Sequence, residues 1–173
     1  TELDLTTIDA IAIAAGPGSF TGLRIGSATA KGLGLALKKP LISIPTVDAL
    51  AYNLYGTDRL ICPIMDARRN QVYAAFYMWE NGKLIRLTDH MAESIERVIE
   101  IAEMLEHEVI FLGDGVPVHR ERLEQNPAFL FAPAHCNMQR ASAVAALGAI
   151  MAEEGLAKPG NAFELIYLRK SQA

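Results

Sequence analysis

Cysteine is scarce in this chain of 173 residues: Cys62 and Cys136 are the only two, and they form no CxxC pair. Isolated thiols of this kind are typical of a reducing compartment, so we expect free cysteines rather than a disulfide or a metal site. No apolar run approaches the length of a membrane span, and no pattern typical of a signal peptide is present. We therefore expect a cytoplasmic location and no membrane partner.

The chain also lacks an excess of basic residues. It carries 16 Lys and Arg against 20 Asp and Glu, which gives a formal net charge of -4. Nucleic-acid binding depends largely on clustered positive charge, and no basic stripe stands out along the sequence. The chain alone is therefore a poor candidate for gripping nucleic acid.

Recognisable catalytic motifs are missing as well. The spacing of His90, His107, His119 and His135 gives neither HExxH nor HxxxH, so we expect no zinc or iron site and interpret these histidines as surface or loop residues. Ser19 lies in GPGSF, which is not the GxSxG nucleophile elbow. No pair of groups has the arrangement that acid–base or nucleophilic catalysis needs. We therefore predict no catalytic residue and no metal ligand.

Two acidic positions leave alternatives open. Asp66 precedes Arg68 and Arg69 at the tip of an expected hairpin. It either forms local salt links there or touches a nucleotide or a partner. Asp114 lies between two glycines after an expected strand, where it either forms an Asx turn or binds a ligand at the strand end.

The first third of the chain predicts alternating strands and helices. The expected elements are a buried strand over 8–15, a helix from Ser19 or Thr21 to about Leu37, a strand over 41–44 and a helix from Thr46 or Asp48 to about Tyr55. Pro17 ends the first strand because proline cannot donate to a ladder. Strand and helix in alternation indicate parallel pairing and an α/β architecture.

Residues 59–155 carry a different pattern. Strands are expected over 59–65, 71–79 and 84–87, and Asn81-Gly82 between the last two signals a tight hairpin turn. The remaining expected elements are an amphipathic helix over 94–106, a buried strand over 109–112, a helix from about Val118 and a helix over 139–154.

We interpret this organisation as two related lobes. Residues 58–157 form a complete second lobe, residues 1–57 are the remainder of a first lobe truncated at its N-terminus, and residues 158–173 are a tail that returns to the first lobe. By analogy between the two halves, we expect roughly 50 residues of the first lobe to be missing upstream. A single irregular α/β domain is the alternative.

The sequence GPGSFTGLRIG at 16–26 looks like a phosphate-binding loop. The P-loop pattern GxxxxGK[ST] fails because Thr21 stands at its sixth position. The GxGxxG fingerprint fails because Gly22 comes one place late. Backbone amides at a helix start still attract anions, so Gly18 and Ser19 are weak candidates for an anion contact.

Small residues recur at every fourth position of the helix that follows this loop. The ridge consists of Gly22, Gly26, Ala30 and Gly34, with Leu23 beside it. Each interior glycine costs roughly 1 kcal/mol relative to alanine, so the spacing indicates that another backbone comes close. Two interpretations stay open: the ridge packs on the chain's own sheet, or it meets a partner protein.

Three motifs together carry a family resemblance. GPGSFTGLRIG at 16–26, MDARRNQVY at 65–73 and YLRKSQ at 167–172 closely resemble the bacterial TsaB (YeaZ) family, in order and in spacing. The resemblance covers essentially the whole chain and implies an α/β, actin-like ATPase fold, similar to that of sugar kinases, with two related lobes. The DTS-type first phosphate loop of the family is absent, and Leu165 stands where the family commonly has proline.

The same resemblance implies a role. Members of the family pair with the homologous TsaD subunit and, with the TsaE ATPase, support threonylcarbamoyl transfer to the adenosine beside the anticodon of tRNA, without being the catalyst. No cofactor is then expected on this chain alone, because ATP and metal belong to the partner subunits, and tRNA is contacted only indirectly. The alternative is a small-molecule kinase or a glycoprotease-like peptidase that uses the cleft between the lobes.

Pairing in the family uses helices of the first lobe, which points to residues 20–37. The predicted interface residues are Gly22, Leu23, Gly26, Ala30 and Gly34. A surface shaped for a homologue can also accept a second copy of the chain, so a homodimer through this helix is a further alternative.

Overall fold

The computed structural model describes residues 4–168, and the chain divides into two compact units. Within the described residues, unit 1 is formed by residues 4–49 and 141–167, and unit 2 by residues 50–140 together with Leu168. Unit 1 contains the clusters around Leu41 and around Ile44, and unit 2 contains a larger cluster around Phe76. The end of the YLRKSQ motif lies outside the described residues.

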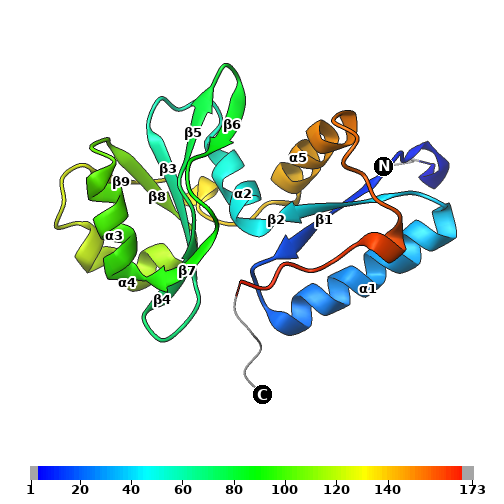
Figure 1. Ribbon diagram of the computed structural model, residues 1–173, viewed down its shortest axis with the longest axis horizontal. Helices are drawn as coiled ribbons and strands as arrows, with labels where there is room; N and C mark the ends of the chain where they lie inside the picture. The colour runs from blue at the N-terminus through cyan, green and yellow to red at the C-terminus, as the bar shows by residue number, and fades with distance from the viewer. Residues whose placement is uncertain (1–3, 169–173) are drawn as a thin grey trace. The chain divides into compact units, whose positions relative to one another are not determined.

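Unit 1 is built on a two-stranded parallel sheet with a helix on each face, as Figure 1 shows. Its elements are β1 (Ile11–Gly16), α1 (Phe20–Leu37), β2 (Leu41–Pro45) and α5 (Ala141–Glu153), with 3-10 turns at Leu5–Thr7 and Gly160–Ala162. Side chains alternate along a strand, so Ile13 and Leu41 face α1 while Ala12 and Ile42 face α5.

Helix α1 begins where the sequence predicts. The Oγ atom of Ser19 accepts a hydrogen bond from the backbone N–H of Gly22 at 3.3 Å, which caps the first turn. The helix ends at Leu37, and the backbone of its C-cap residue, Lys38, is left-handed with a φ of 55°. Its N–H bonds back to the carbonyls of Gly34 and Leu35, which satisfies the last turn.

The segment after α5 returns to the sheet of unit 1. Lys158 forms an isolated antiparallel bridge with Leu41, in which each backbone N–H donates to the other residue's carbonyl at 2.8 Å. Phe163 is buried against the same cluster, and the N–H of Ile166 donates to the carbonyl of Ala15. Residues 158–167 therefore belong to unit 1, and residues 169–173 of the expected tail lie outside the described residues.

Unit 2 is organised around a mixed sheet. Its strands are β3 (Leu60–Asp66), β4 (Gln71–Ala74), β5 (Tyr77–Glu80), β6 (Lys83–Arg86), β7 (Met91–Ser94), β8 (Val109–Leu112) and β9 (Phe129–Phe131). The central strand β3 pairs antiparallel with β4 and β5 and parallel with β8, which pairs parallel with β9. Parallel strands β3 and β8 therefore end at the same edge of the sheet.

Helices complete unit 2. They are α3 (Ile95–Met104) and α4 (Gly115–Leu123), with 3-10 turns at Tyr52–Leu54 and Ala134–Cys136. The division between the units falls within α2 (Thr46–Ala51). Helix α3 is capped by Ser94 and buries Ile95, Val98 and Ala102, as its amphipathic pattern predicts. The core cluster beneath it includes Cys62, Phe76 and Phe111.

Several elements differ from the sequence-based expectation. The strand expected over 71–79 is two strands, because the chain breaks from its ladder at Ala75 and Phe76. The short strands β7 and β9 were not expected, and α4 begins at Gly115 rather than Val118. No helix in residues 4–168 combines the length and the apolar character that crossing a membrane requires.

Helix α5 groups with unit 1, whereas the expected boundary at residue 157 places it in the second lobe. The reason is local packing: a Cβ atom on Gly148 would lie 2.5 Å from the Cβ of Ala12, so α5 sits directly on β1. Val144, Leu147 and Met151 extend this contact over Ile42 and Ile44 of β2.

Candidate functional site

Helix α1 has one face packed on its own sheet. Ser27, Ala30 and Gly34 are buried along this face. A Cβ atom on Gly34 would lie 3.0 Å from the Cδ2 atom of Leu41, and one on Gly26 would lie 3.7 Å from the Cδ1 atom of Ile13. The glycines therefore let the helix backbone approach β1 and β2 closely.

This geometry changes the role of the predicted interface residues. Of the five, Ala30 and Gly34 are buried against the sheet, Leu23 and Gly26 are half-buried, and only Gly22 is exposed, in the first turn. Of the two interpretations of the small-residue ridge, packing on the chain's own sheet explains why Gly26, Ala30 and Gly34 are small. A partner contact of Gly22 and Leu23 stays a prediction, and a larger partner surface on α1 needs further exposed residues.

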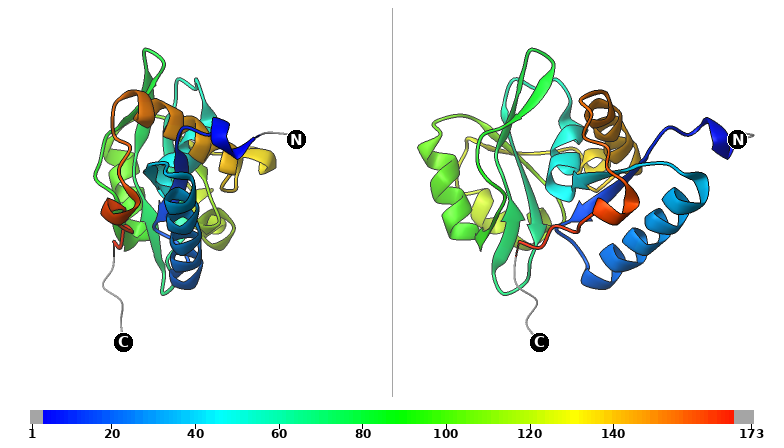
Figure 2. Two further views of the ribbon diagram at one scale, coloured as in Figure 1. Left: turned by 90° about the vertical axis from the view of Figure 1, so that its right-hand side faces the viewer. Right: turned by 45° about the vertical axis from the view of Figure 1, so that its right-hand side comes forward.

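The opposite face of α1 points away from the sheet of unit 1. Ile25 is 63% exposed and Leu35 is 82% exposed on this face, and Ala28, Gly32 and Ala36 form a second ridge of small residues between them. Figure 2 (right) shows α1 from the side, below strands β1 and β2 of unit 1. We call these five residues the outward face of α1.

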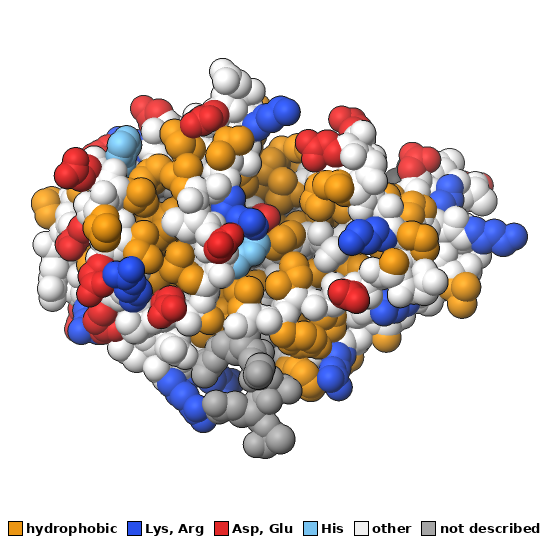
Figure 3. All heavy atoms as spheres, viewed as in Figure 1, with side chains coloured by type: hydrophobic (Ala, Val, Ile, Leu, Met, Phe, Trp, Pro, Cys, Tyr) orange, Lys and Arg blue, Asp and Glu red, His pale blue; other side chains and the backbone are white. Residues whose placement is uncertain are grey.

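The outward face has the chemistry of a helix-docking surface. Only two residues of the 18-residue helix, Arg24 and Lys31, are charged, so hydrophobic groups remain exposed along it. Figure 3 shows hydrophobic side chains among basic ones at the lower right, where α1 lies. No heavy atom comes within 4 Å of a Cβ position on Gly32, so a second helix can approach closely there. Apolar groups left in water favour association with another apolar surface.

The start of α1 was a weak candidate for an anion contact at Gly18 and Ser19. The hydroxyl of Ser19 is engaged in capping the helix, while Gly18 is exposed. The Arg24 guanidinium lies 3.9 Å from the ring centroid of Phe20, and this ring lies 6.0 Å from that of Tyr167. The anion contact stays a prediction.

In unit 2 the structure brings the two open acidic positions together. The backbone N–H of Asp66 donates to the Oδ1 atom of Asp114 at 3.1 Å, and Asp66 Oδ1 accepts from the N–H of Arg68 at 2.8 Å. Both aspartates follow strands that run parallel, so their carboxyl ends meet at one edge of the sheet. The sequence analysis did not predict that β3 pairs with β8, and this pairing is what brings the two aspartates together.

His119 is the exception among the histidines expected on the surface or in loops. It lies in α4 and is only 5% exposed, and within residues 4–168 no hydrogen-bond partner reaches its Nε2 atom. Burial lowers the pKa of its imidazole from the ordinary value of 6.5, and the Asp66 carboxylate acts in the opposite direction. Burial therefore favours the neutral form of this imidazole.

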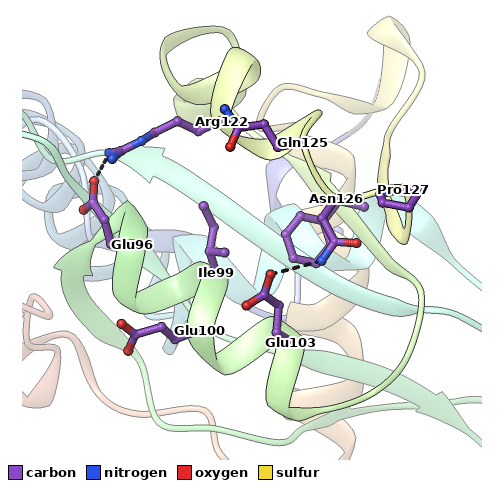
Figure 4. Close-up of a pocket in the computed structure, with 9 residues that line it drawn as sticks. Glu96, Ile99, Glu100, Glu103, Arg122, Gln125, Asn126 and Pro127 are labelled. Atoms are coloured by element: carbon purple, nitrogen blue, oxygen red, sulfur yellow. Dashed lines mark hydrogen bonds and ion pairs between the residues drawn. The ribbon is translucent and has the colours of Figure 1, made fainter.

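A groove of about 570 Å³ lies between α3 and the connection from α4 to β9 (Figure 4). Ile99, Pro127 and Phe129 contribute apolar lining, and Glu96, Glu100 and Glu103 line the α3 side. Contacts cross it at two places: Glu96 pairs with Arg122, and Glu103 accepts from the amide of Asn126 at 3.2 Å. The third carboxylate, Glu100, pairs with Arg97 at 2.8 Å. All three carboxylates that line the groove thus already have partners.

Metal and thiol chemistry receive no support from the described part of the chain. Among residues 4–168, no group of three His, Cys, Asp or Glu side chains is placed to hold a metal ion. Cys62 and Cys136 are both free and buried, and burial raises the pKa of the Cys62 thiol well above its ordinary value. A thiol of this kind is a packing residue rather than a nucleophile.

Comparison with known proteins gives a consistent match. Residues 1–171 match the family described as "TsaD: tRNA N6-adenosine threonylcarbamoyltransferase". The chain is 37% identical over 114 residues to the tRNA threonylcarbamoyladenosine biosynthesis protein TsaB of Bacillus subtilis, covering 66% of this chain and 50% of that protein. The TsaB protein of Escherichia coli is also 37% identical, over 115 residues that cover 64% of this chain and 49% of that protein. The chain thus matches about half the length of these relatives.

Solved structures agree. A protein from Pseudomonas aeruginosa described as similar to peptidase YeaZ superposes with a TM-score of 0.82 at 27% identity, covering 96% of this chain and 76% of that one. YeaZ from Pseudomonas aeruginosa superposes with a TM-score of 0.78 at 25% identity, covering 95% and 76%. Both similarities extend over nearly the whole chain.

Proposed function

This chain belongs to the TsaD family of tRNA N6-adenosine threonylcarbamoyltransferases, in its TsaB (YeaZ) group with the actin-like ATPase fold, and from this premise we propose that it is a non-catalytic subunit in threonylcarbamoyladenosine biosynthesis on tRNA. Its partner is a homologous TsaD-type subunit, which it holds in an active shape. A TsaE-type ATPase completes the assembly. ATP and metal act on these partners.

The outward face of α1 is the observation that carries this proposal. A helix that is apolar on two opposite sides is covered on both sides in a stable assembly, and the sheet of unit 1 covers only one. Ile25 and Leu35 supply the exposed apolar anchors, and Gly32 between them lets a partner helix come close. A subunit that works by binding needs such a surface more than it needs reactive groups.

The chemistry of the described residues favours the role of a non-catalytic subunit over that of a catalyst. The paired aspartates at the ends of β3 and β8 engage each other and the turn after β3, and His119 is buried beside them. These contacts do not place either carboxylate where it would act as the general base for an exposed nucleophile. The catalytic groups are accordingly assigned to the TsaD-type partner.

A reconstituted modification assay tests this function. Threonylcarbamoyl transfer to tRNA is measured with purified TsaD-type and TsaE-type subunits, with and without this chain. We expect little transfer without the chain and a stimulation of at least about tenfold with it, which corresponds to about 1.4 kcal/mol of coupling. Equal transfer in both reactions contradicts the proposed function.

A further inference from the structure

The turn that joins β3 to β4 has an unusual backbone. Arg68, Arg69 and Asn70 have φ angles of 61°, 56° and 59°, so three successive residues with side chains are left-handed. Such residues normally visit this region singly, because the Cβ atom crowds the following carbonyl. A turn of this kind persists only where its surroundings hold it.

Hydrogen bonds on both sides hold the turn. Asp66 Oδ1 accepts from the N–H of Arg68 at 2.8 Å, and the N–H of Asp66 donates to Asp114 Oδ1 at 3.1 Å. At the other end, the amide of Asn70 donates to both carboxylate oxygens of Glu96, at 3.1 and 3.2 Å. The turn is thus tied to the start of α4 and to the start of α3, which fixes where its two arginines project.

The turn carries two adjacent guanidinium groups. Arg68 and Arg69 are both exposed. The carboxylates of Asp66 and Glu96 accept hydrogen bonds from the turn itself, and that of Asp114 accepts from the N–H of Asp66. Figure 3 shows a basic side chain projecting at the lower end of the view, where this hairpin ends. Guanidinium groups on a fixed support bind phosphate oxygens in bidentate fashion with little further loss of freedom.

We propose that Arg68 and Arg69, presented by this left-handed turn, contact the phosphate backbone of tRNA directly. The inference rests on the proposed function, which brings the chain beside tRNA, and departs from the expectation that tRNA is contacted only indirectly. Charge alone favours any anionic partner, but tRNA is the polyanion that the proposed assembly modifies, and an extended phosphate backbone can contact two adjacent guanidinium groups at once. Asp66 is the positioning residue, because it anchors the turn without projecting from it.

The test is the salt dependence of tRNA binding by the chain with its TsaD-type partner, followed by fluorescence anisotropy from about 50 to 200 mM salt. Each lost phosphate contact reduces the magnitude of the negative slope of log K against log salt by about 0.7 to 0.9. The double variant Arg68→Gln/Arg69→Gln should therefore make the slope less negative by about 1.4 to 1.8, since two such contacts are lost. The control Arg59→Gln/Lys83→Gln removes the same charge elsewhere in unit 2 and should leave the slope unchanged.

Asp66→Ala separates positioning from bulk attraction. Removing a carboxylate strengthens the attraction of any anion if only net charge matters. If the turn must be held, the same variant weakens tRNA binding, although it keeps both arginines. Tighter binding by this variant, or an arginine variant that matches its control, overturns the inference.

Two further outcomes separate the inference from the proposed function. If the arginine variant keeps its tRNA slope but loses a protein partner, the turn binds an acidic protein segment and the RNA assignment is wrong. If the wild-type chain stimulates modification while the slopes are equal, this inference fails and the proposed function stands. If the wild-type chain does not stimulate modification, the proposed function fails. The salt slopes still show whether the turn binds tRNA, and they are measured on the chain alone if no complex forms.

Discussion

Replacing Gly113 with alanine is expected to destabilise unit 2 by about 3 to 5 kcal/mol. Gly113 has a φ of +111°, and a Cβ atom there would lie 2.1 Å from the carbonyl oxygen of Ile64. Both features belong to the backbone, so rotation of a side chain cannot relieve the contact. Strands β3 and β8 would have to separate at the edge where Asp66 and Asp114 meet. Urea unfolding of the variant measures the loss.

Gly56→Ala is the matched control for this substitution. Gly56 also has a positive φ, of +75°, but no heavy atom lies within 4 Å of its Cβ position. Only the backbone penalty of about 1 kcal/mol remains at such a site. Equal losses for the two variants would contradict the explanation from the close approach of Ile64.

The double variant Ile25→Glu/Leu35→Lys should weaken binding to the TsaD-type subunit by about 100-fold or more. Each exposed apolar anchor contributes about 1.5 to 3 kcal/mol when it is buried, and about 1.4 kcal/mol is a factor of ten. The acidic residue near the helix start and the basic one near its end suit the helix dipole, so α1 itself should remain folded. Titration calorimetry against the purified partner measures the affinity.

The control for this variant is Met104→Glu/Val118→Lys in unit 2. Met104 is 76% exposed and Val118 is 60% exposed, so the same number of exposed apolar side chains is replaced with the same change in charge. We expect unchanged affinity for this control and an unchanged circular dichroism spectrum for both variants. Similar losses for both would mean that the effect is general rather than local to α1.

Helix α1 shows how far the sequence reaches. Ser19, one of the two expected capping residues, caps the helix, and its expected end at about Leu37 was confirmed, because both features depend on neighbouring residues. Two ridges of small residues share the same fourfold spacing, one through Gly26 and one through Gly32, and spacing alone does not say which faces the sheet. The near absence of charge around the helix was the available signal that both of its sides are apolar.

In unit 2, too, some elements could be predicted from the sequence and others could not. The Asn81-Gly82 turn was confirmed, with φ angles of 50° and 76°, because this residue pair favours that conformation locally. Strands β7 and β9 have only four and three residues, and their ladders depend on distant partners in β4 and β8. Segments that short carry too little periodicity to be recognised.

The meeting of Asp66 and Asp114 at the ends of β3 and β8 could not be predicted from the sequence for a similar reason. Asp66 and Asp114 are 48 positions apart, and only the parallel pairing of their strands makes them neighbours. His119 lies on a helix with a weak amphipathic pattern, so its burial follows from the packing of α4 on β3 and β8. Tertiary pairing, rather than local preference, builds this part of the molecule.

Site-specific cross-linking tests the role of the outward face of α1 most directly. Cysteine is introduced at Gly32 or, as a control, at Gly56; neither has a heavy atom within 4 Å of its Cβ position, and the native Cys62 and Cys136 are buried. A photoreactive group attached at position 32 should give a covalent adduct with the TsaD-type subunit, and one at position 56 should not. An adduct from position 56 alone would contradict docking through α1.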